Sequence, residues 1–205
     1  MKEDLAEKNI YWQESTVTRQ DRINLKGHNP AVIWLTGLSG AGKTTLSREI
    51  EKGLHEMGVH TYLLDGDNIR HGLNRDLGFS KKDRKENIRR IAEVARLFAD
   101  AGLVVICAFI TPYEEDRRHI KEIVGDNELI NVYVKCPIDV CIKRDPKGLY
   151  KKALKGEIKG FTGIDDPYEE PARAEIVVET HRMSIQECAH IVLSYLRNNG
   201  LFRRG

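Results

Sequence analysis

The sequence lacks the cysteine patterns of a disulfide scaffold or a zinc domain. Its 205 residues include four cysteines, none of them in a C-x-x-C pair or in a Cys/His cluster with zinc-ligand spacing. Isolated cysteines of this kind are typical of small core residues in a reducing compartment. We therefore predict that all of them are reduced and buried; they are Cys107, Cys136, Cys141 and Cys188.

Long apolar runs and an excess of one charge are also missing. The longest apolar run, residues 103–110, is too short to cross a bilayer, and the N-terminus is too polar for a signal peptide. The 33 basic and 31 acidic side chains leave a formal net charge of +2, which does not favour nucleic acid as a partner. We expect a cytoplasmic protein with no membrane or nucleic-acid partner.

What the sequence does have is a regular alternation of strand and helix patterns. Short apolar runs alternate with amphipathic or capped helical stretches, which predicts an α/β fold with a five-stranded parallel sheet and helices on both faces. The predicted strands are residues 31–36, 60–65, 103–110, 129–135 and 174–180. The predicted helices follow the glycine-rich turn at 37–44, Ser80, Pro112, Pro137 and Ser184.

Two stretches fall outside this alternation. Residues 1–29 are polar, and we predict an N-terminal arm with low order at its start and one short helix near residues 18–25. Residues 30–205 would form the single domain. Within it, residues 145–171 have no periodicity and are rich in lysine and glycine, which is typical of a lid or binding loop.

Residues 37–44 form a glycine-rich turn between the first predicted strand and the helix that follows. They match the pattern G-x-x-x-x-G-K-[ST], in which glycines let backbone N–H groups surround a phosphate. Lys43 would reach the β- and γ-phosphates, and the Thr44 hydroxyl would ligate Mg²⁺. No Asn-Lys-x-Asp motif is present to bind guanine, so we predict ATP. The predicted loop residues are Gly37, Leu38, Ser39, Gly40, Ala41, Gly42, Lys43 and Thr44.

A second polar cluster follows the strand predicted at residues 60–65. The run Asp-Gly-Asp-Asn at residues 65–68 could be a simple turn, but ligands of parallel α/β sheets bind at this end of the strands. Asp67 could accept or orient the proton of an attacking hydroxyl. Arginines nearby would suit an anionic acceptor, because a guanidinium binds phosphate or sulfate oxygens in pairs. The residues of this group are Arg70, Arg75, Arg84 and Asn87.

Several longer stretches resemble adenylylsulfate kinases, and the resemblance runs from about residue 9 to residue 202. The stretches DGDNIRHGLN, from residue 65, and DPKGLYKKA, from residue 145, carry it most specifically. The resemblance implies a P-loop kinase fold with a lid. It also implies transfer of the γ-phosphate of ATP to the ribose 3′-hydroxyl of adenylyl sulfate, with Mg²⁺, in sulfate activation. A homodimer is typical of the family, and association with an ATP sulfurylase is a further expectation.

By position, the resemblance also assigns roles to single residues. Asp67 and Lys43 would act in catalysis, and Arg144 would contact ATP beneath the lid. Thr111 occupies the place of a serine described in some bacterial members as a phosphorylated intermediate, although direct in-line transfer requires no such step. Phe79 and Phe161 would sandwich the adenine of the acceptor, unless they are core residues. The full set of expected acceptor contacts is Asp67, Arg70, Phe79, Arg84, Asn87, Ile110, Lys147 and Phe161.

Two other functions are compatible with the same phosphate-binding turn. One is a related small-molecule P-loop kinase that acts on gluconate or a nucleoside; the arginines and the Asp-Gly-Asp-Asn run count against it. The other is a catalytically silent nucleotide-binding module, which the presence of Lys43, Thr44 and Asp67 disfavours.

Overall fold

The fold is a sheet between two layers of helices, seen here in a computed structural model that describes residue 11 and residues 13–200. The predicted start of the N-terminal arm, the predicted end of the domain and the last residues of the family resemblance lie outside the described residues. Within the described part, no helix is long and apolar enough to cross a membrane.

Five parallel strands form the sheet within the described residues, in the order β2-β3-β1-β4-β5. The predicted α/β fold with a parallel sheet is therefore confirmed. Every residue of the central strand β1 is buried, because helices cover both faces of the sheet. The strands are β1 (Ala31–Thr36), β2 (Thr61–Asp65), β3 (Val104–Ala108), β4 (Leu129–Lys135) and β5 (Ile176–Glu179).

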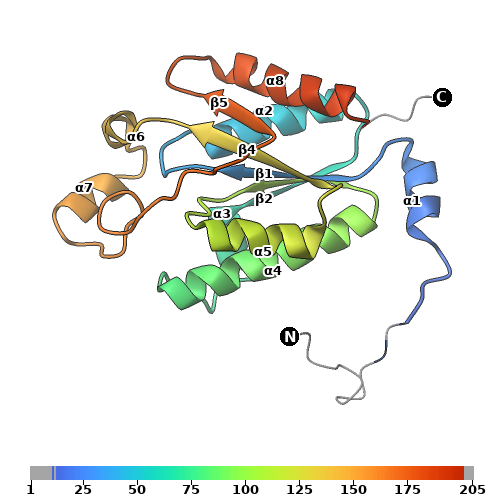
Figure 1. Cartoon of the computed structure of the whole chain (residues 1–205), viewed down its shortest axis with the longest axis horizontal. Helices are drawn as coiled ribbons and strands as arrows, with labels where there is room; N and C mark the ends of the chain where they lie inside the picture. Colours follow the sequence, from blue (N-terminus) through green and yellow to red (C-terminus); the bar gives the residue numbers. More distant parts are fainter. Residues whose placement is uncertain (1–10, 12, 201–205) are drawn as a thin grey trace.

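Two pairs of long helices cover the sheet, one pair on each face (Figure 1). Helices α2 (Lys43–Glu56) and α8 (Ile185–Asn198) pack together on one face, and α4 (Lys81–Asp100) and α5 (Glu114–Val124) on the other. Alternate residues of β1 enter the two cores: Ile33 packs under the first pair and Trp34 under the second. Helix α8 follows Ser184 as predicted, and a capping box of Ser184 and Glu187 starts it.

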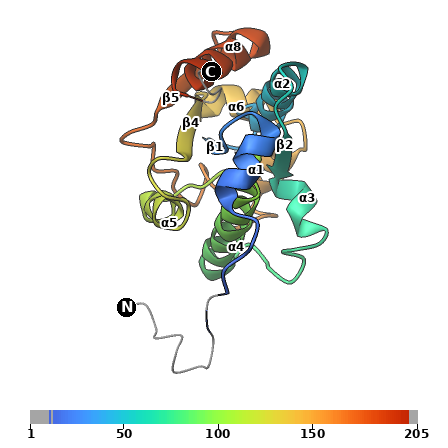
Figure 2. The same ribbon diagram turned by 90° about the vertical axis from the view of Figure 1, so that its right-hand side faces the viewer.

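The short helix α1 (Arg19–Lys26) lies at the amino ends of the strands, nearest the viewer in Figure 2. His28, which follows it, joins this region to the sheet. Its Nδ1 lies 3.2 Å from the Asn29 carbonyl oxygen, and its Nε2 accepts the backbone N–H of His60 at 3.0 Å. An imidazole that accepts at Nε2 is neutral. Burial lowers the pKa of His28, in agreement with that state.

Two short helices appear where the sequence predicted none. Helix α3 (Gly66–Arg70) replaces the turn after β2, and α7 (Leu149–Leu154) lies inside the stretch predicted to be aperiodic. Both are held by aspartates at their starts: the Asp65 carboxylate accepts the Asp67 N–H, and the Asp145 carboxylate accepts two N–H groups of α7. A helix of five or six residues is too short to produce a repeating apolar pattern.

Smaller differences concern the ends of elements. Helix α5 begins at Glu114 rather than at Pro112, and β5 is shorter than the strand predicted at 174–180. Helix α6 (Ile138–Arg144) follows Pro137, as predicted. Together with α7 it lies beyond the carboxyl ends of the strands (Figure 1). The four cysteines are free and buried, as the sequence predicts.

Candidate active site

The glycine-rich turn connects β1 to α2 at the carboxyl end of the sheet. Gly37 has a φ of 154°, and a Cβ at this position would come within 2.5 Å of the Val134 carbonyl oxygen. Gly42, the residue before α2, has a φ of 97°, which side-chain-bearing residues rarely adopt. Both positions therefore require glycine. The loop ends at the amino terminus of α2, where free N–H groups and the helix dipole favour an anion.

Lys43 lies within this loop and is bonded to it. Its Nζ donates to the carbonyl oxygens of Gly37 and Leu38, each at 2.8 Å. Burial lowers the pKa of Lys43 to about 8, and the nearby negative charges of Asp65 and Asp67 partly oppose this shift. A phosphate bound beside this amine would stabilise its charged form. The predicted role of Lys43 as a phosphate contact fits this position.

Thr44 and Asp65 meet at the base of the loop. The Thr44 hydroxyl donates to Asp65 Oδ2 at 2.8 Å, and the other oxygen of that carboxylate accepts the Asp67 N–H at 3.0 Å. A hydroxyl and a buried carboxylate are hard oxygen donors, and Mg²⁺ takes its remaining ligands from phosphates and water. These two residues therefore fit a Mg²⁺ site. Asp65 was not among the predicted site residues. A signal for it was available in the sequence: no acidic residue ends β3, so a carboxylate for a metal would have to come from another strand.

Asp67 is exposed in the first turn of α3, and its carboxylate forms an ion pair with the Lys147 ammonium. Lys147 belongs to the stretch predicted as a lid, 80 residues further along the chain. The structure thus brings together two predicted site residues from distant segments. Because both also influence the pKa of Lys43, they lie within the electrostatic reach of the phosphate loop.

The start of the predicted lid is attached to the phosphate loop. Arg144 donates to the Thr180 carbonyl oxygen at 2.6 Å and to the Gly40 carbonyl oxygen at 3.4 Å. The Tyr150 hydroxyl donates to the Ser39 carbonyl oxygen at 3.0 Å. Arg144 therefore lies at the edge of the loop, and the ATP contact that the family resemblance implies for it stays a prediction.

A pocket of about 420 Å³ lies between the start of α4 and the predicted lid, and the predicted acceptor residues Phe79 and Arg84 line it. Phe79 is 68% exposed, so a face of its ring is accessible to a ligand. The pocket carries both an aromatic ring and several charged groups, which suits a planar base attached to an anion. Its lining residues are Phe79, Ser80, Lys81, Arg84, Tyr113, Lys159, Gly160 and Asp166.

The Arg84 guanidinium is held at the pocket wall by several groups. It donates to the Phe79 carbonyl oxygen at 2.9 Å, to Thr162 Oγ1 at 2.8 Å and to the Gly160 carbonyl oxygen. The Asp166 carboxylate lies 3.7 Å away and accepts the Tyr113 hydroxyl at 2.7 Å. Sequence reasoning missed these partners, because no local pattern links residues so far apart in the chain.

Arg70 and Asn87 complete the predicted group. Arg70 lies 4.3 Å from the centre of the Phe79 ring and donates to the Leu77 and Gly78 carbonyl oxygens. Burial, and then the positive charge of Arg84, lower the pKa of Arg70, so an anion would be favoured between the two guanidinium groups. Asn87 is buried, and its amide oxygen accepts from Asn74 at 2.9 Å.

Comparison with known proteins agrees with this geometry. The family model for adenylylsulphate kinase matches residues 29–179. An adenylyl-sulfate kinase of Oceanobacillus iheyensis is 56% identical over 190 residues, which cover 93% of this chain and 96% of that protein. The chain belongs to the adenylylsulfate kinase family.

Solved structures agree with this assignment. The Mycobacterium tuberculosis APS kinase CysC, solved in complex with AMPPNP and APS, is 44% identical with a TM-score of 0.78. The match covers 83% of this chain and 99% of that chain. A gluconokinase of Sinorhizobium meliloti, 17% identical with a TM-score of 0.54 over 84% of this chain and 95% of its own, shares the fold alone.

Three further residues that the family resemblance singles out are engaged by other parts of the protein. Phe161 is 9% exposed, packs edge-on against Tyr150 and does not line the pocket beside Phe79. A sandwich of both rings around adenine stays a prediction, and it requires Phe161 to move. The Ile110 carbonyl oxygen accepts the Thr36 hydroxyl and the Gly37 N–H, so only other parts of Ile110 are available to a ligand.

Thr111, the third of these residues, is buried and has a left-handed backbone with a φ of 48°. Its hydroxyl accepts the Trp34 indole N–H at 2.9 Å, and its carbonyl oxygen accepts from Arg117 at 2.8 Å. A β-branched residue is strained in this conformation, so these contacts must hold it there. In the described conformation the Thr111 hydroxyl is not accessible to ATP.

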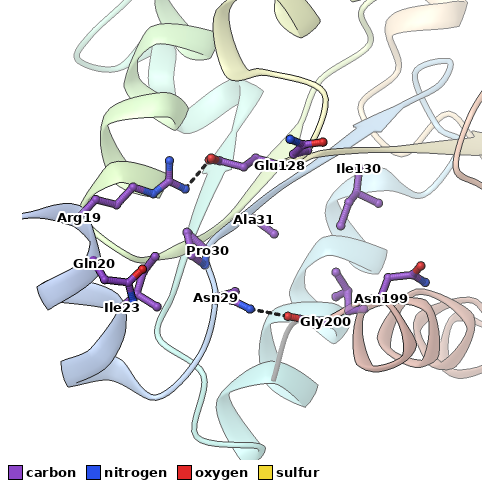
Figure 3. Close-up of a pocket in the computed structure, with 12 residues that line it drawn as sticks. Arg19, Gln20, Ile23, Asn29, Pro30, Ala31, Glu128, Ile130, Asn199 and Gly200 are labelled. Carbon is purple, nitrogen blue, oxygen red and sulfur yellow. Dashed lines mark hydrogen bonds and ion pairs between the residues drawn. The ribbon is translucent and has the colours of Figure 1, made fainter. Parts of the chain in front are cut away.

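Another pocket, of about 500 Å³, lies at the amino ends of the strands, opposite the phosphate loop (Figure 3). It is formed by α1, the first residues of β1 and the end of α8, and the Arg19–Glu128 ion pair crosses it at 2.6 Å. None of the site residues that the family resemblance predicts lines it. The pocket is therefore separate from the phosphate loop.

Proposed function

We propose that this chain transfers the γ-phosphate of ATP to the ribose 3′-hydroxyl of adenylyl sulfate and releases ADP and 3′-phosphoadenylyl sulfate. Membership of the adenylylsulfate kinase family supports this activity. The observation that carries the proposal is the double contact of Asp65. One of its oxygens bonds to Thr44 of the phosphate loop and the other to the backbone of Asp67, so the acidic turn is fastened to the loop.

In this proposal Asp67 orients the 3′-hydroxyl and accepts its proton as the new P–O bond forms. Lys43 stabilises the negative charge on the transferred phosphoryl group. Thr44 and Asp65 would hold Mg²⁺, which, when bound, supplies charge neutralisation between the β- and γ-phosphates. Lys147 and the segment around it would exclude water, which otherwise competes with the ribose hydroxyl for the phosphoryl group.

The acceptor would lie across the pocket beside α4. Its adenine would stack on the exposed ring of Phe79, and its phosphosulfate would lie near Arg70 and Arg84. Arg84 would exchange some of its present protein contacts for anion oxygens, since its donors are already engaged. Asn87 would donate an amide N–H to the phosphosulfate as well.

The remaining expectations concern location and assembly. We infer a cytoplasmic homodimer whose substrates are ATP and adenylyl sulfate, and association with an ATP sulfurylase is a further prediction. Analytical ultracentrifugation of the purified chain tests the dimer, and a single species at the monomer mass would contradict it.

The direct test is ATP-dependent conversion of adenylyl sulfate by the purified chain with Mg²⁺, followed as ADP release and as the phosphorylated product. Gluconate and a nucleoside serve as comparison acceptors. We expect turnover only with adenylyl sulfate. Phosphorylation of gluconate without conversion of adenylyl sulfate would favour the related small-molecule kinase instead.

The variant Lys43→Ala separates an active kinase from a silent nucleotide-binding module. Loss of one preorganised charge stabiliser lowers turnover on the order of 10²–10³-fold. We expect this loss with an unchanged circular dichroism spectrum, since the variant removes the phosphate contact and two hydrogen bonds within the loop but no contact between helices and strands. Equal, near-zero ADP release by the wild type and the variant would support the silent module.

A further inference from the structure

The end of the predicted lid is joined to the strand that leads into the phosphate loop by a half-buried chain of hydrogen bonds. Tyr168 and Thr36 lie 132 residues apart, yet their hydroxyl oxygens are 3.0 Å apart. Thr36 is the last residue of β1 and directly precedes the first glycine of the loop. Figure 1 shows the chain between α7 and β5, which contains Tyr168, returning across the sheet.

The direction of these hydrogen bonds follows from the number of protons. The Thr36 hydroxyl lies 2.6 Å from the Ile110 carbonyl oxygen, which can only accept, so Thr36 donates its single proton there. The proton between Tyr168 and Thr36 must therefore come from Tyr168. Burial raises the pKa of Tyr168 to about 12, so its hydroxyl keeps that proton near neutral pH.

The same junction is held from its other side by Arg117. This buried guanidinium donates to the carbonyl oxygens of Thr111 and Glu169, each at 2.8 Å, and pairs with Glu114. The Glu169 N–H donates to the Pro112 carbonyl oxygen at 2.8 Å. The segment that carries Tyr168 is thus fixed to the end of β1 and to the loop that follows β3.

Both ends of the lid are therefore attached to the phosphate-binding strand and loop. The start is bound through Tyr150 to the Ser39 carbonyl oxygen, and the end through Tyr168 to Thr36. Gly160, bonded to Arg84, lies between these attachments, and Lys147, paired with Asp67, lies three residues before the first of them. A shift of the second attachment would move groups on the acceptor side relative to the phosphates.

We propose that Tyr168 is a positioning residue: its hydroxyl, acting through Thr36, sets the lid and the acceptor groups in register with the phosphate loop. This inference rests on the proposed function. Tyr168 touches neither substrate in this account and acts only through its contact with the strand end. Misplacement of reacting groups lowers turnover more than it lowers the binding of either substrate alone.

The test is Tyr168→Phe, which keeps the ring and removes the hydroxyl. We expect kcat with adenylyl sulfate to fall about threefold to tenfold, the factor that corresponds to one net hydrogen bond, while the Kd for ATP changes less than twofold. The matched control is Tyr133→Phe, because the Tyr133 ring stacks on Tyr168 with ring centres 6.2 Å apart, whereas the hydroxyl of Thr36, its neighbour in the β1–β4 ladder, bonds to Tyr168, Ile110 and Thr111 instead. Its kcat is expected to stay within twofold of wild type.

A double-mutant cycle shows whether the effect passes through Thr36. Thr36→Ser keeps the hydroxyl and is expected to retain kcat within twofold. In a Thr36→Val background, Tyr168→Phe is expected to cause no further loss. An unchanged kcat in Tyr168→Phe, or the same loss in both backgrounds, would overturn the proposal.

A second measurement does not depend on the acceptor. With saturating Mg-ATP, trypsin is expected to cleave the lid lysines at least threefold faster in Tyr168→Phe than in wild type or Tyr133→Phe, with the cleaved bonds identified by mass spectrometry. Equal cleavage rates would contradict the role of Tyr168. Failure of the wild type to convert adenylyl sulfate would instead contradict the proposed function, and cleavage would still decide this inference. The lid lysines that this measurement follows are those after Tyr150 in the chain, namely Lys151, Lys152, Lys155 and Lys159.

Discussion

Two carboxylates, separated by one glycine, take different parts in the site. Asp65 is buried and fully engaged by Thr44 and the Asp67 backbone, whereas Asp67 is exposed and paired with Lys147. The buried residue joins the acidic turn to the phosphate loop, and in the proposed function it would also hold Mg²⁺ with Thr44. The exposed residue can reach an acceptor hydroxyl.

For Asp67→Asn we expect kcat to fall at least about 100-fold, the lower end of the range for loss of a positioned acid or base, with little change in the Kd for ATP. The amide keeps the size of the side chain but does not accept the proton. Steady-state kinetics and nucleotide titration measure the two quantities. An unchanged kcat would remove Asp67 from the mechanism.

Thr111 lies in the place of a phosphorylated serine, but its surroundings oppose that chemistry. Its hydroxyl is buried and accepts the Trp34 N–H. We expect no label on Thr111 after incubation of the protein with γ-labelled ATP alone, followed by peptide mapping. Stable label on this residue would refute direct transfer. Thr111→Ser, which keeps the hydroxyl, is the matched variant.

Among the helices, α8 depends on its first turn. The Ser184 hydroxyl accepts the Glu187 N–H at 3.2 Å, and the Glu187 carboxylate accepts the Ser184 N–H at 2.7 Å. Removal of such a cap costs about 1 kcal/mol of stability. We expect Ser184→Ala to lower the free energy of unfolding in urea by that amount. Gln186→Ala, an exposed change in the same turn, is the control, and an equal loss in both would contradict the capping role.

The main helices and strands could be predicted because each carries a long periodic pattern within one stretch of chain. The last residues of β2 and the start of α4 were also recognisable from Asp65 and Ser80. Helices α3 and α7 could not be predicted, because single turns held by an aspartate leave no period. Local sequence patterns therefore predicted the helices and strands of the layers better than the connecting segments at the carboxyl ends of the strands.

The site residues, too, could be predicted where the signal lies within one stretch of chain and not where it depends on distant segments. The phosphate loop is contiguous, so its members could be named from the sequence. The contacts that organise the site join distant segments: Thr44 with Asp65, 21 residues apart, and Arg84 with Thr162, 78 residues apart. Such pairs depend on how the chain returns to the sheet, which composition and spacing do not reveal.

The molecule as a whole is expected to lose stability in mild acid. His28, next to α1, is buried and neutral, and burial lowers its pKa from the ordinary value of 6.5. The unfolded chain therefore binds a proton more readily than the folded one. The stabilising contribution is complete above pH 6.5 and is lost as pH falls below that value through the folded pKa.

Urea unfolding between pH 8 and pH 5 measures this dependence. We expect His28→Gln to reduce the slope of stability against pH and His190→Gln, an exposed change on α8, to leave it unaltered. The titratable groups near His28 are His60 and Lys26, and a positive charge on either opposes the protonation of His28. Identical slopes in wild type and His28→Gln would show that other groups cause the acid sensitivity.

The four free cysteine thiols in the core can be used to measure how often the folded protein opens. Cys107, Cys141 and Cys188 have no exposed surface, and Cys136 has 6%. A thiol reagent such as a maleimide should therefore leave the native protein almost unmodified and react with it only as fast as the core opens. The kinetics of labelling, followed by intact mass, would then show whether nucleotide closes the molecule, without any added dye or tag.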